Sequence, residues 1–197
     1  MRFTSLLSFI AITCIFACKS KQQYTNPHIQ ITTKFGTIEA ELYPDKAPKS
    51  VAAILSYIDS DFYENTSFYR VLNDDNQPSG TGGPTLIQSG LWSTKDKVAA
   101  TLAHIPHETT QQTGLHHEDG TLSLARQEPG TATAEFFICI DDQPGFDFGG
   151  GNNPDGQGYA AFGKVVKGMD VVRRINKQPF NGELFNPKVD ILKIERL

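Results

Sequence analysis

The sequence predicts a mainly β protein of one domain, folded as a closed or nearly closed β-barrel. Short runs of alternating apolar and polar residues recur along the chain, and turn-forming residues (17 Gly and 11 Pro) separate them. Only two segments have helical spacing. The 197 residues are 39% hydrophobic, which is enough to fill one core of ordinary size.

The first elements are predicted to be a hairpin and a helix. Apolar residues alternate over 29–33 and over 38–42, and Gly36 falls in the turn between the two runs. Pro48 then stands near the start of a segment with apolar residues at helical spacing, which predicts a helix that ends near Ile58. The remaining predicted elements are strands over 68–72, 86–88, 120–125, 135–140, 159–165 and 189–194, and a short helix over 169–176.

The chain opens with one basic residue and a short apolar run, and a polar linker follows. The run is short for a membrane-spanning helix, which needs about 20 residues, and is typical of a signal peptide. Its end, Ile15-Phe16-Ala17-Cys18, resembles a bacterial lipobox, which implies cleavage before Cys18 and acylation of its thiol. We therefore expect a signal peptide over 1–17, a lipidated cysteine and flexible tether over 18–28, and a folded domain over 29–197.

This leader predicts an extracytoplasmic protein that its lipid anchors to a bacterial membrane, at the periplasmic face or the cell surface. The alternative is an ordinary cleaved secretion signal with an incidental cysteine. Of the three cysteines, Cys14 is removed with the leader, Cys18 carries the lipid, and Cys139 is expected to be a buried small hydrophobe.

Charge and motifs exclude several function classes. The formal net charge of −4 argues against a nucleic-acid binder. The segment that begins at His107 and Glu108 fails the H-E-x-x-H pattern, because Gln111 replaces the second histidine. No metal site is therefore expected from the remaining candidates, which are His104, His116, His117 and Glu118.

A set of motifs occurs in one order along almost the whole domain, and together they resemble the bacterial cyclophilin-type peptidyl-prolyl isomerases. The motifs are Phe35-Gly36-Thr37-Ile38, Ala47-Pro48-Lys49-Ser50-Val51, Phe62-Tyr63, Phe68-Tyr69-Arg70-Val71, Ile87-Gln88-Ser89-Gly90, Gly120-Thr121-Leu122-Ser123-Leu124-Ala125-Arg126, Glu135-Phe136-Phe137-Ile138 and Tyr159-Ala160-Ala161-Phe162-Gly163-Lys164-Val165. The resemblance implies a closed eight-stranded antiparallel barrel capped by two α-helices.

The resemblance also implies a function, which is isomerisation of X-Pro bonds (EC 5.2.1.8) in unfolded or folding proteins. It implies no cofactor, and we expect a monomer. Arg70 matches the catalytic arginine of the family. The substrate-binding positions that the resemblance implies are Leu86, Gln88, Ala125, Arg126, Glu135, Phe137, Phe146 and Tyr159.

The sequence departs from the family pattern at three places. Thr85 replaces an aromatic residue that usually helps to close the proline pocket. Gly145-Phe146 stands where a Trp-Leu or Phe-Leu pair is common, and Phe146 is expected to supply the wall that is lost at Thr85. Glu135 replaces a glutamine, and its carboxylate is expected to pair with Arg70 and partly neutralise the field of that arginine. On this hypothesis Glu135→Gln raises turnover or leaves it unchanged.

These departures leave two readings open. The first is an active isomerase, and the alternative is a proline-binding or chaperone-like module with weak or no isomerase activity. Two polar Gly/Pro-rich loops, 73–84 and 149–158, lie next to site residues in the sequence. Either they shape substrate access or they are tolerated surface loops.

Overall fold

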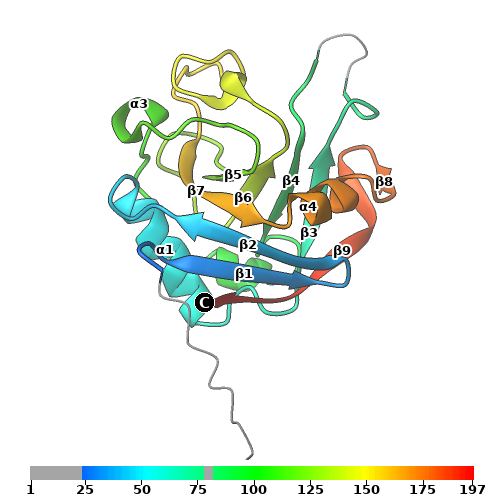
Figure 1. The fold of residues 1–197 in the computed structure, drawn as a ribbon. Helices are drawn as coiled ribbons and strands as arrows, with labels where there is room; N and C mark the ends of the chain where they lie inside the picture. Colours follow the sequence, from blue (N-terminus) through cyan, green and yellow to red (C-terminus); the bar gives the residue numbers. More distant parts are fainter. Residues whose placement is uncertain (1–23, 78–81) are drawn as a thin grey trace, which may run out of the picture.

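The chain forms a closed barrel of antiparallel strands (Figure 1). The computed structural model describes residues 24–77 and 82–197. Within these residues eight strands pair in the ring order β1-β2-β7-β5-β6-β4-β3-β9, and pairing of β1 with β9 closes the ring. The strands of the ring are β1 (His28–Thr33), β2 (Gly36–Leu42), β3 (Thr66–Leu72), β4 (Leu86–Gly90), β5 (Thr121–Leu124), β6 (Phe136–Cys139), β7 (Ala160–Lys167) and β9 (Leu184–Arg196). The predicted eight-stranded antiparallel barrel is confirmed.

The first two strands form the predicted hairpin. Thr33 pairs with Gly36 at its tip, and Ile31 pairs with Ile38 in the buried interior. Gly36 has φ of +129°, a conformation that side chains rarely adopt. The Thr33 hydroxyl donates to the Gly36 carbonyl at 2.9 Å and accepts from the Phe35 amide at 3.1 Å, so the turn is closed by its own residues.

Two amphipathic helices cover the barrel core, as predicted. Helix α1 (Pro48–Asp59) contacts β7 and β9, and helix α4 (Met169–Asn176) contacts β2 and β4. In Figure 1, α1 lies at the left of the barrel and α4 at the right. The buried residues of both helices, which include Ile54 and Val172, join the same core as the strands.

Four short elements of the structure were not predicted from the sequence. They are α2 (Asp96–Ala99), α3 (Thr110–Thr113), the 3₁₀ turn η1 (Pro144–Phe146) and β8 (Phe180–Asn181), which forms a small hairpin with the start of β9. Each spans a turn or less, which is too short for a hydrophobic period to show in a sequence.

Strand β6 takes part in two hydrophobic clusters, because successive side chains of a strand point to opposite faces. Phe136 and Ile138 point into the barrel core. The alternate residues of the strand, Phe137 and Cys139, belong to a second cluster outside that core, which also contains Leu72, Leu86 and Phe146. Cys139 is fully buried and free, as expected, and burial raises the pKa of its thiol.

The end of the expected tether differs from its prediction. Residues 24–27 pack on the barrel instead of hanging free, because the Tyr24 ring stacks on His28 with 3.7 Å between centroids. The Asn26 amide donates to Glu41 at 2.9 Å, and the Pro27 carbonyl accepts from the Leu42 amide. The predicted signal peptide and Cys18 lie outside the described residues. In the part of the chain that is described, no helix has the length and apolar character needed to cross a membrane.

Candidate active site

The outward face of the second cluster lines a cavity of about 160 Å³. Its walls come from the neighbouring strands β3, β4 and β6, from the segment after β5, and from the chain on either side of loop 149–158. The lining residues are Arg70, Leu72, Pro84, Leu86, Gln88, Ala125, Arg126, Phe137, Phe146, Asn152 and Tyr159. Every site residue implied by the sequence resemblance is among them except Glu135. Leu72, Pro84 and Asn152 were not anticipated.

Three aromatic rings form the floor of this cavity. Phe137, Phe146 and Tyr159 lie edge to face with one another, with centroid separations of 5.3, 5.2 and 5.2 Å. Such edge-to-face packing fixes ring orientation in a way that aliphatic side chains do not. The floor is therefore a rigid apolar surface that suits a flat, compact ring.

Phe146, which was expected to supply the wall that Thr85 does not provide, lines this cavity as part of its aromatic floor. Thr85 lies elsewhere, in a separate cavity with Ile140 and Asn176. Its main-chain carbonyl accepts from the Ile140 amide at 2.9 Å. Leu72 and Pro84 line the first cavity, and Thr85 does not.

Arg70 stands at the rim of the cavity with its guanidinium held on two sides. Its Nη1 donates to Gln88 Oε1 at 2.9 Å, because Arg70 and Gln88 are register partners on β3 and β4. Its Nε donates to Glu183 Oε2 at 2.8 Å, and Nη2 lies 2.7 Å from the same oxygen. A third of the Arg70 side chain stays exposed, so a fixed cation faces the cavity mouth.

Glu183 is a functional neighbour that sequence reasoning missed. It precedes β9, 113 residues after Arg70, and no local pattern marks it. Only the pairing of β3 with β9, in which Arg70 faces Leu184, brings the carboxylate to the arginine.

The expected Glu135–Arg70 pair is wrong. One oxygen of Glu135 accepts from the Tyr69 hydroxyl at 2.5 Å, and the other accepts from the Leu91 and Trp92 amides at 2.6 and 2.9 Å. Glu135 precedes β6 and packs against Gly90, where a Cβ would lie 2.2 Å from the carboxyl carbon. Burial raises the pKa of the Glu135 carboxyl, although the hydrogen bonds from Tyr69, Trp92 and Leu91 oppose that shift.

Glu135 instead lines a neighbouring cavity of about 580 Å³. This second cavity shares Gln88, Ala125 and Arg126 with the first, so an extended peptide that fills one can continue into the other. Its remaining lining residues are Tyr69, Trp92, His104, Gln127, Thr131 and Thr133.

Arg126 reaches the first cavity, but its guanidinium is already engaged. Its side chain is only 2% exposed and forms a two-pronged ion pair with Asp155, at 2.8 and 2.9 Å. It also donates to the Gly158 carbonyl and lies over the Tyr159 ring, 5.4 Å from the centroid. Arg126 thus ties loop 149–158 to the end of β5 and offers little of its charge to a ligand.

The histidines of the rejected metal motif have separate partners. Buried His117 bridges Asp147 Oδ1 at 2.7 Å and Ser123 Oγ at 2.9 Å, and its ring stacks on Phe137. This Ser-His-Asp order matches a hydrolase triad, but Ser123 is completely buried and no substrate reaches its hydroxyl. Among the described residues, no group of three or more His, Cys, Asp or Glu side chains is placed to hold a metal ion.

Glu108, the acidic member of that motif, caps a helix. Its carboxylate accepts from the amides of Lys49 and Ser50 at 3.1 and 2.8 Å, and from the Ser50 hydroxyl at 2.7 Å. These amides belong to the first turn of α1, whose own N-cap residue, Ala47, has no side-chain acceptor.

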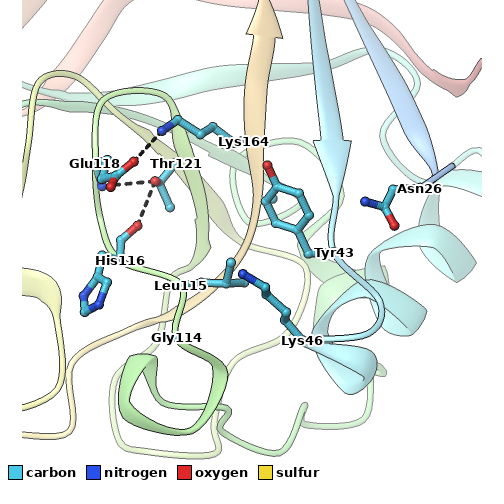
Figure 2. Close-up of a pocket in the computed structure, with 10 residues that line it drawn as sticks. Asn26, Tyr43, Lys46, Gly114, Leu115, His116, Glu118, Thr121 and Lys164 are labelled. Carbon is cyan, nitrogen blue, oxygen red and sulfur yellow. Dashed lines mark hydrogen bonds and ion pairs between the residues drawn. The ribbon is translucent and has the colours of Figure 1, made fainter. Parts of the chain in front are cut away.

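Figure 2 shows a further cavity, of about 440 Å³, that shares no residue with the first. The Lys164 ammonium contacts Glu118 at 2.5 Å, and Thr121 bonds to the chain at His116 and Glu118. Lys164 and Glu118 therefore pair with each other, and Tyr43 and Lys46 line the same cavity.

Comparison with known proteins identifies the family of the chain. A family model described as "Cyclophilin type peptidyl-prolyl cis-trans isomerase/CLD" matches residues 28–196. The peptidyl-prolyl cis-trans isomerase of Acinetobacter baylyi is 37% identical over 175 residues, which are 88% of this chain and 85% of that protein. Peptidyl-prolyl cis-trans isomerase B of Escherichia coli is 39% identical over 144 residues, or 73% of this chain and 80% of that protein.

The fold has the same relatives. A crystal structure of a cyclophilin-type isomerase from Cryptosporidium parvum superposes with a TM-score of 0.70 at 21% identity, and the match covers 87% of this chain and 98% of that one. At this identity the superposition supports the barrel fold alone, whereas the family model and the closer sequence relatives also fix the lineage. The chain therefore belongs to the cyclophilin-type peptidyl-prolyl cis-trans isomerases, an enzyme family of class EC 5.2.1.8.

Proposed function

We propose that this enzyme accelerates X-Pro bond rotation during the folding of extracytoplasmic proteins, with Arg70 as its catalytic residue. The observation that carries the proposal is the placement of a fixed cation beside a small aromatic pocket. Arg70 and Phe137 line the same cavity, and hydrogen bonds from Arg70 to Gln88 and Glu183 hold the guanidinium there.

The chemistry needs no covalent step. Amide resonance imposes a rotation barrier of about 18–20 kcal/mol, so that uncatalysed X-Pro isomerisation takes tens to hundreds of seconds. When the bond twists, the proline nitrogen becomes pyramidal and gains a lone pair. A hydrogen bond from a fixed guanidinium to that nitrogen stabilises the twisted state more than the planar one, which lowers the barrier.

Each part of the site has a role in this scheme. The ring of proline rests on the floor made by Phe137, Phe146 and Tyr159, beside Leu86, and this contact fixes one side of the rotating bond. Gln88 and the main chain at Ala125 bind the peptide backbone that leaves the pocket toward the larger cavity. The substrates are proline-containing segments of unfolded or folding proteins.

We also propose that the mature enzyme starts at a lipidated Cys18 and acts as a monomer outside the cytoplasm. The support is the lipobox pattern of the leader together with the site's position. The residues that line the pocket belong to β3, β4, β6 and the loops beside them, and none belongs to β1, the strand next to the leader. An anchored chain thus keeps its pocket free.

The test is a cis/trans exchange assay on an X-Pro peptide that compares the unaltered protein with Arg70→Ala. Loss of a single donor aimed at a developing charge commonly lowers turnover by roughly 100- to 1,000-fold, and we expect a fall of that order. Proline-peptide binding is measured in parallel and is expected to persist, since the aromatic floor remains. Equal exchange rates for the two proteins would instead favour the proline-binding or chaperone-like module.

A further inference from the structure

An uninterrupted series of hydrogen bonds connects Glu135 to Arg70 without direct contact between them. Arg70 Nη1 donates to Gln88 Oε1 at 2.9 Å, Gln88 Nε2 donates to the Tyr69 oxygen at 2.6 Å, and the Tyr69 hydroxyl donates to Glu135 Oε2 at 2.5 Å. We propose that Tyr69 and Glu135 are positioning residues that orient the Gln88 amide and, through it, the guanidinium of Arg70. This inference rests on the proposed catalytic role of Arg70.

The direction of each bond follows from the number of protons available. A carboxylate only accepts, so the single hydroxyl proton of Tyr69 goes to Glu135. The Tyr69 oxygen is then left as an acceptor, and the neighbour that can donate to it is the NH₂ group of Gln88. Once that NH₂ group faces Tyr69, the carbonyl oxygen of Gln88 faces Arg70, which is the orientation that a guanidinium needs.

The surroundings keep the series in one state. Tyr69 is only 4% exposed, and burial together with the adjacent Glu135 charge raises the pKa of its hydroxyl, so the proton stays on the oxygen. The other oxygen of Glu135 accepts from the Leu91 and Trp92 amides, which fix the carboxylate in place. In a low-dielectric setting, hydrogen bonds that run in one direction strengthen one another.

The alternative orientation of Gln88 shows what the series prevents. An amide flipped by 180° would point its NH₂ group at the N–H of Arg70, and two donors cannot bond. The guanidinium would then depend on Glu183, whose side chain is half exposed and therefore more mobile. Arg70 would keep its charge but lose its fixed direction, and a rotating amide is stabilised only by a donor aimed at its nitrogen.

Tyr69→Phe is the decisive variant, because it breaks the series and keeps the aromatic ring against Trp92, as well as both backbone bonds to Glu135. In the full-length protein in detergent, NMR exchange on an X-Pro peptide measures kcat and KM. We expect Tyr69→Phe to lower kcat about tenfold while KM changes by less than about twofold. Glu135→Gln, which places an NH₂ group opposite the Tyr69 oxygen, is expected to lower kcat as well. This reverses the expectation that followed from a direct Glu135–Arg70 pair, because Glu135 bonds to Tyr69 instead.

The matched control is Tyr63→Phe. Tyr63 is also a buried tyrosine whose hydroxyl makes a 2.8 Å bond, but it donates to the Ala134 carbonyl, outside the series. Loss of the Tyr63 hydroxyl is expected to leave kcat unchanged. This result would show that a lower kcat in Tyr69→Phe comes from lost positioning of Arg70 and not from the removal of a buried hydroxyl in general. A second comparison uses Gln88→Ala, in which Tyr69→Phe is expected to have no additional effect because the connection to Arg70 is already cut.

Two results would overturn the inference. The first is an unchanged kcat in Tyr69→Phe, and the second is a Tyr69→Phe effect on kcat that is as large in the Gln88→Ala protein as in the unaltered protein. Neither result touches the proposed function, which depends on Arg70→Ala. If Arg70→Ala loses activity and Tyr69→Phe does not, Arg70 is catalytic and its orientation does not depend on Tyr69. If Arg70→Ala keeps full activity, the proposed catalytic role itself fails.

Discussion

At the scale of single residues, the pocket floor depends on polar groups beneath it. The His117 ring stacks on Phe137 at 6.1 Å and meets Phe146 and Tyr159 edge-on. Because a carboxylate only accepts hydrogen bonds, Nδ1 of His117 is the protonated ring nitrogen and donates to Asp147 Oδ1. Asp147 also accepts from the His117 main-chain amide, so one carboxylate fixes both the ring and its backbone.

Asp147→Asn is expected to weaken the fold in a pH-dependent way. Burial works to raise the pKa of the Asp147 carboxyl, but hydrogen bonds from His117 and His116 outweigh it, and the net pKa is lowered. A lowered pKa gives stability above the unfolded value of about 3.9, and that stability disappears as pH falls through the folded value. The variant should lose about 1–3 kcal/mol at pH 7 and show a shallower decline in acid.

Urea unfolding at pH 7 and at pH 3 measures both effects. The exposed Asp170, which pairs with Arg174 on the surface of α4, supplies the control Asp170→Asn. If Asp147→Asn and the unaltered protein lose the same stability between the two pH values, the Asp147 carboxylate does not provide the pH-dependent term.

At the scale of elements, loop 149–158 is folded against η1. The Gly149 amide donates to the Gly156 carbonyl at 2.8 Å, and the Asn152 amide donates to the Gly145 carbonyl at 3.1 Å. Gly150 packs so closely that a Cβ there would lie 2.4 Å from the same Gly145 carbonyl. The loop thereby brings Asn152 into the pocket wall, which favours a role in substrate access over a tolerated surface insertion.

Asp155→Ala is expected to loosen this wall, because Asp155 receives both prongs of Arg126. We expect KM for an X-Pro peptide to rise about threefold to tenfold while kcat is retained, since Arg70 is not touched. Hydrogen exchange of the loop amides should increase in the same variant. An unchanged KM with faster exchange would mean that the loop moves without affecting the substrate.

At the scale of the whole molecule, the start of the described chain and the pocket belong to different parts of the barrel. The pocket strands β3, β4 and β6 are consecutive in the ring, whereas β1 and β2 belong to the other part of it. The described chain enters at Tyr24, which packs on His28 at the start of β1. With the proposed lipid anchor at Cys18, a membrane therefore need not approach the pocket.

Cys18→Ser is expected to release the protein from membranes without loss of isomerase activity. A serine hydroxyl cannot form the thioether that carries the lipid. Detergent phase partitioning and labelling with a radioactive fatty acid measure the change, and the unaltered chain should be both membrane-bound and labelled. Recovery of the unaltered chain in the aqueous phase without label would support an ordinary secretion signal instead.

Much of the fold was predictable from local sequence. Alternation over 29–33 and 38–42 and the apolar spacing after Pro48 predicted the hairpin and α1 correctly, because these periods reflect the burial of one face. The two-residue β8 and the single-turn α2 had no such period. Tyr24 and Asn26 looked like tether residues because their partners, His28 and Glu41, become neighbours only after β1 and β2 pair.

The sequence by itself determined the family, the barrel and most of the residues that line the pocket, since ordered motifs and strand periodicity are properties of the chain. Leu72, Pro84 and Asn152 joined the pocket only in the folded chain. The tertiary structure alone decided how the charges pair. Glu135 contacts Tyr69 and not Arg70, Arg70 takes Glu183 from 113 residues away, and Arg126 binds Asp155. Such choices depend on distance and direction in space, because a side chain forms its hydrogen bonds with whichever group the folded backbone brings within about 3 Å.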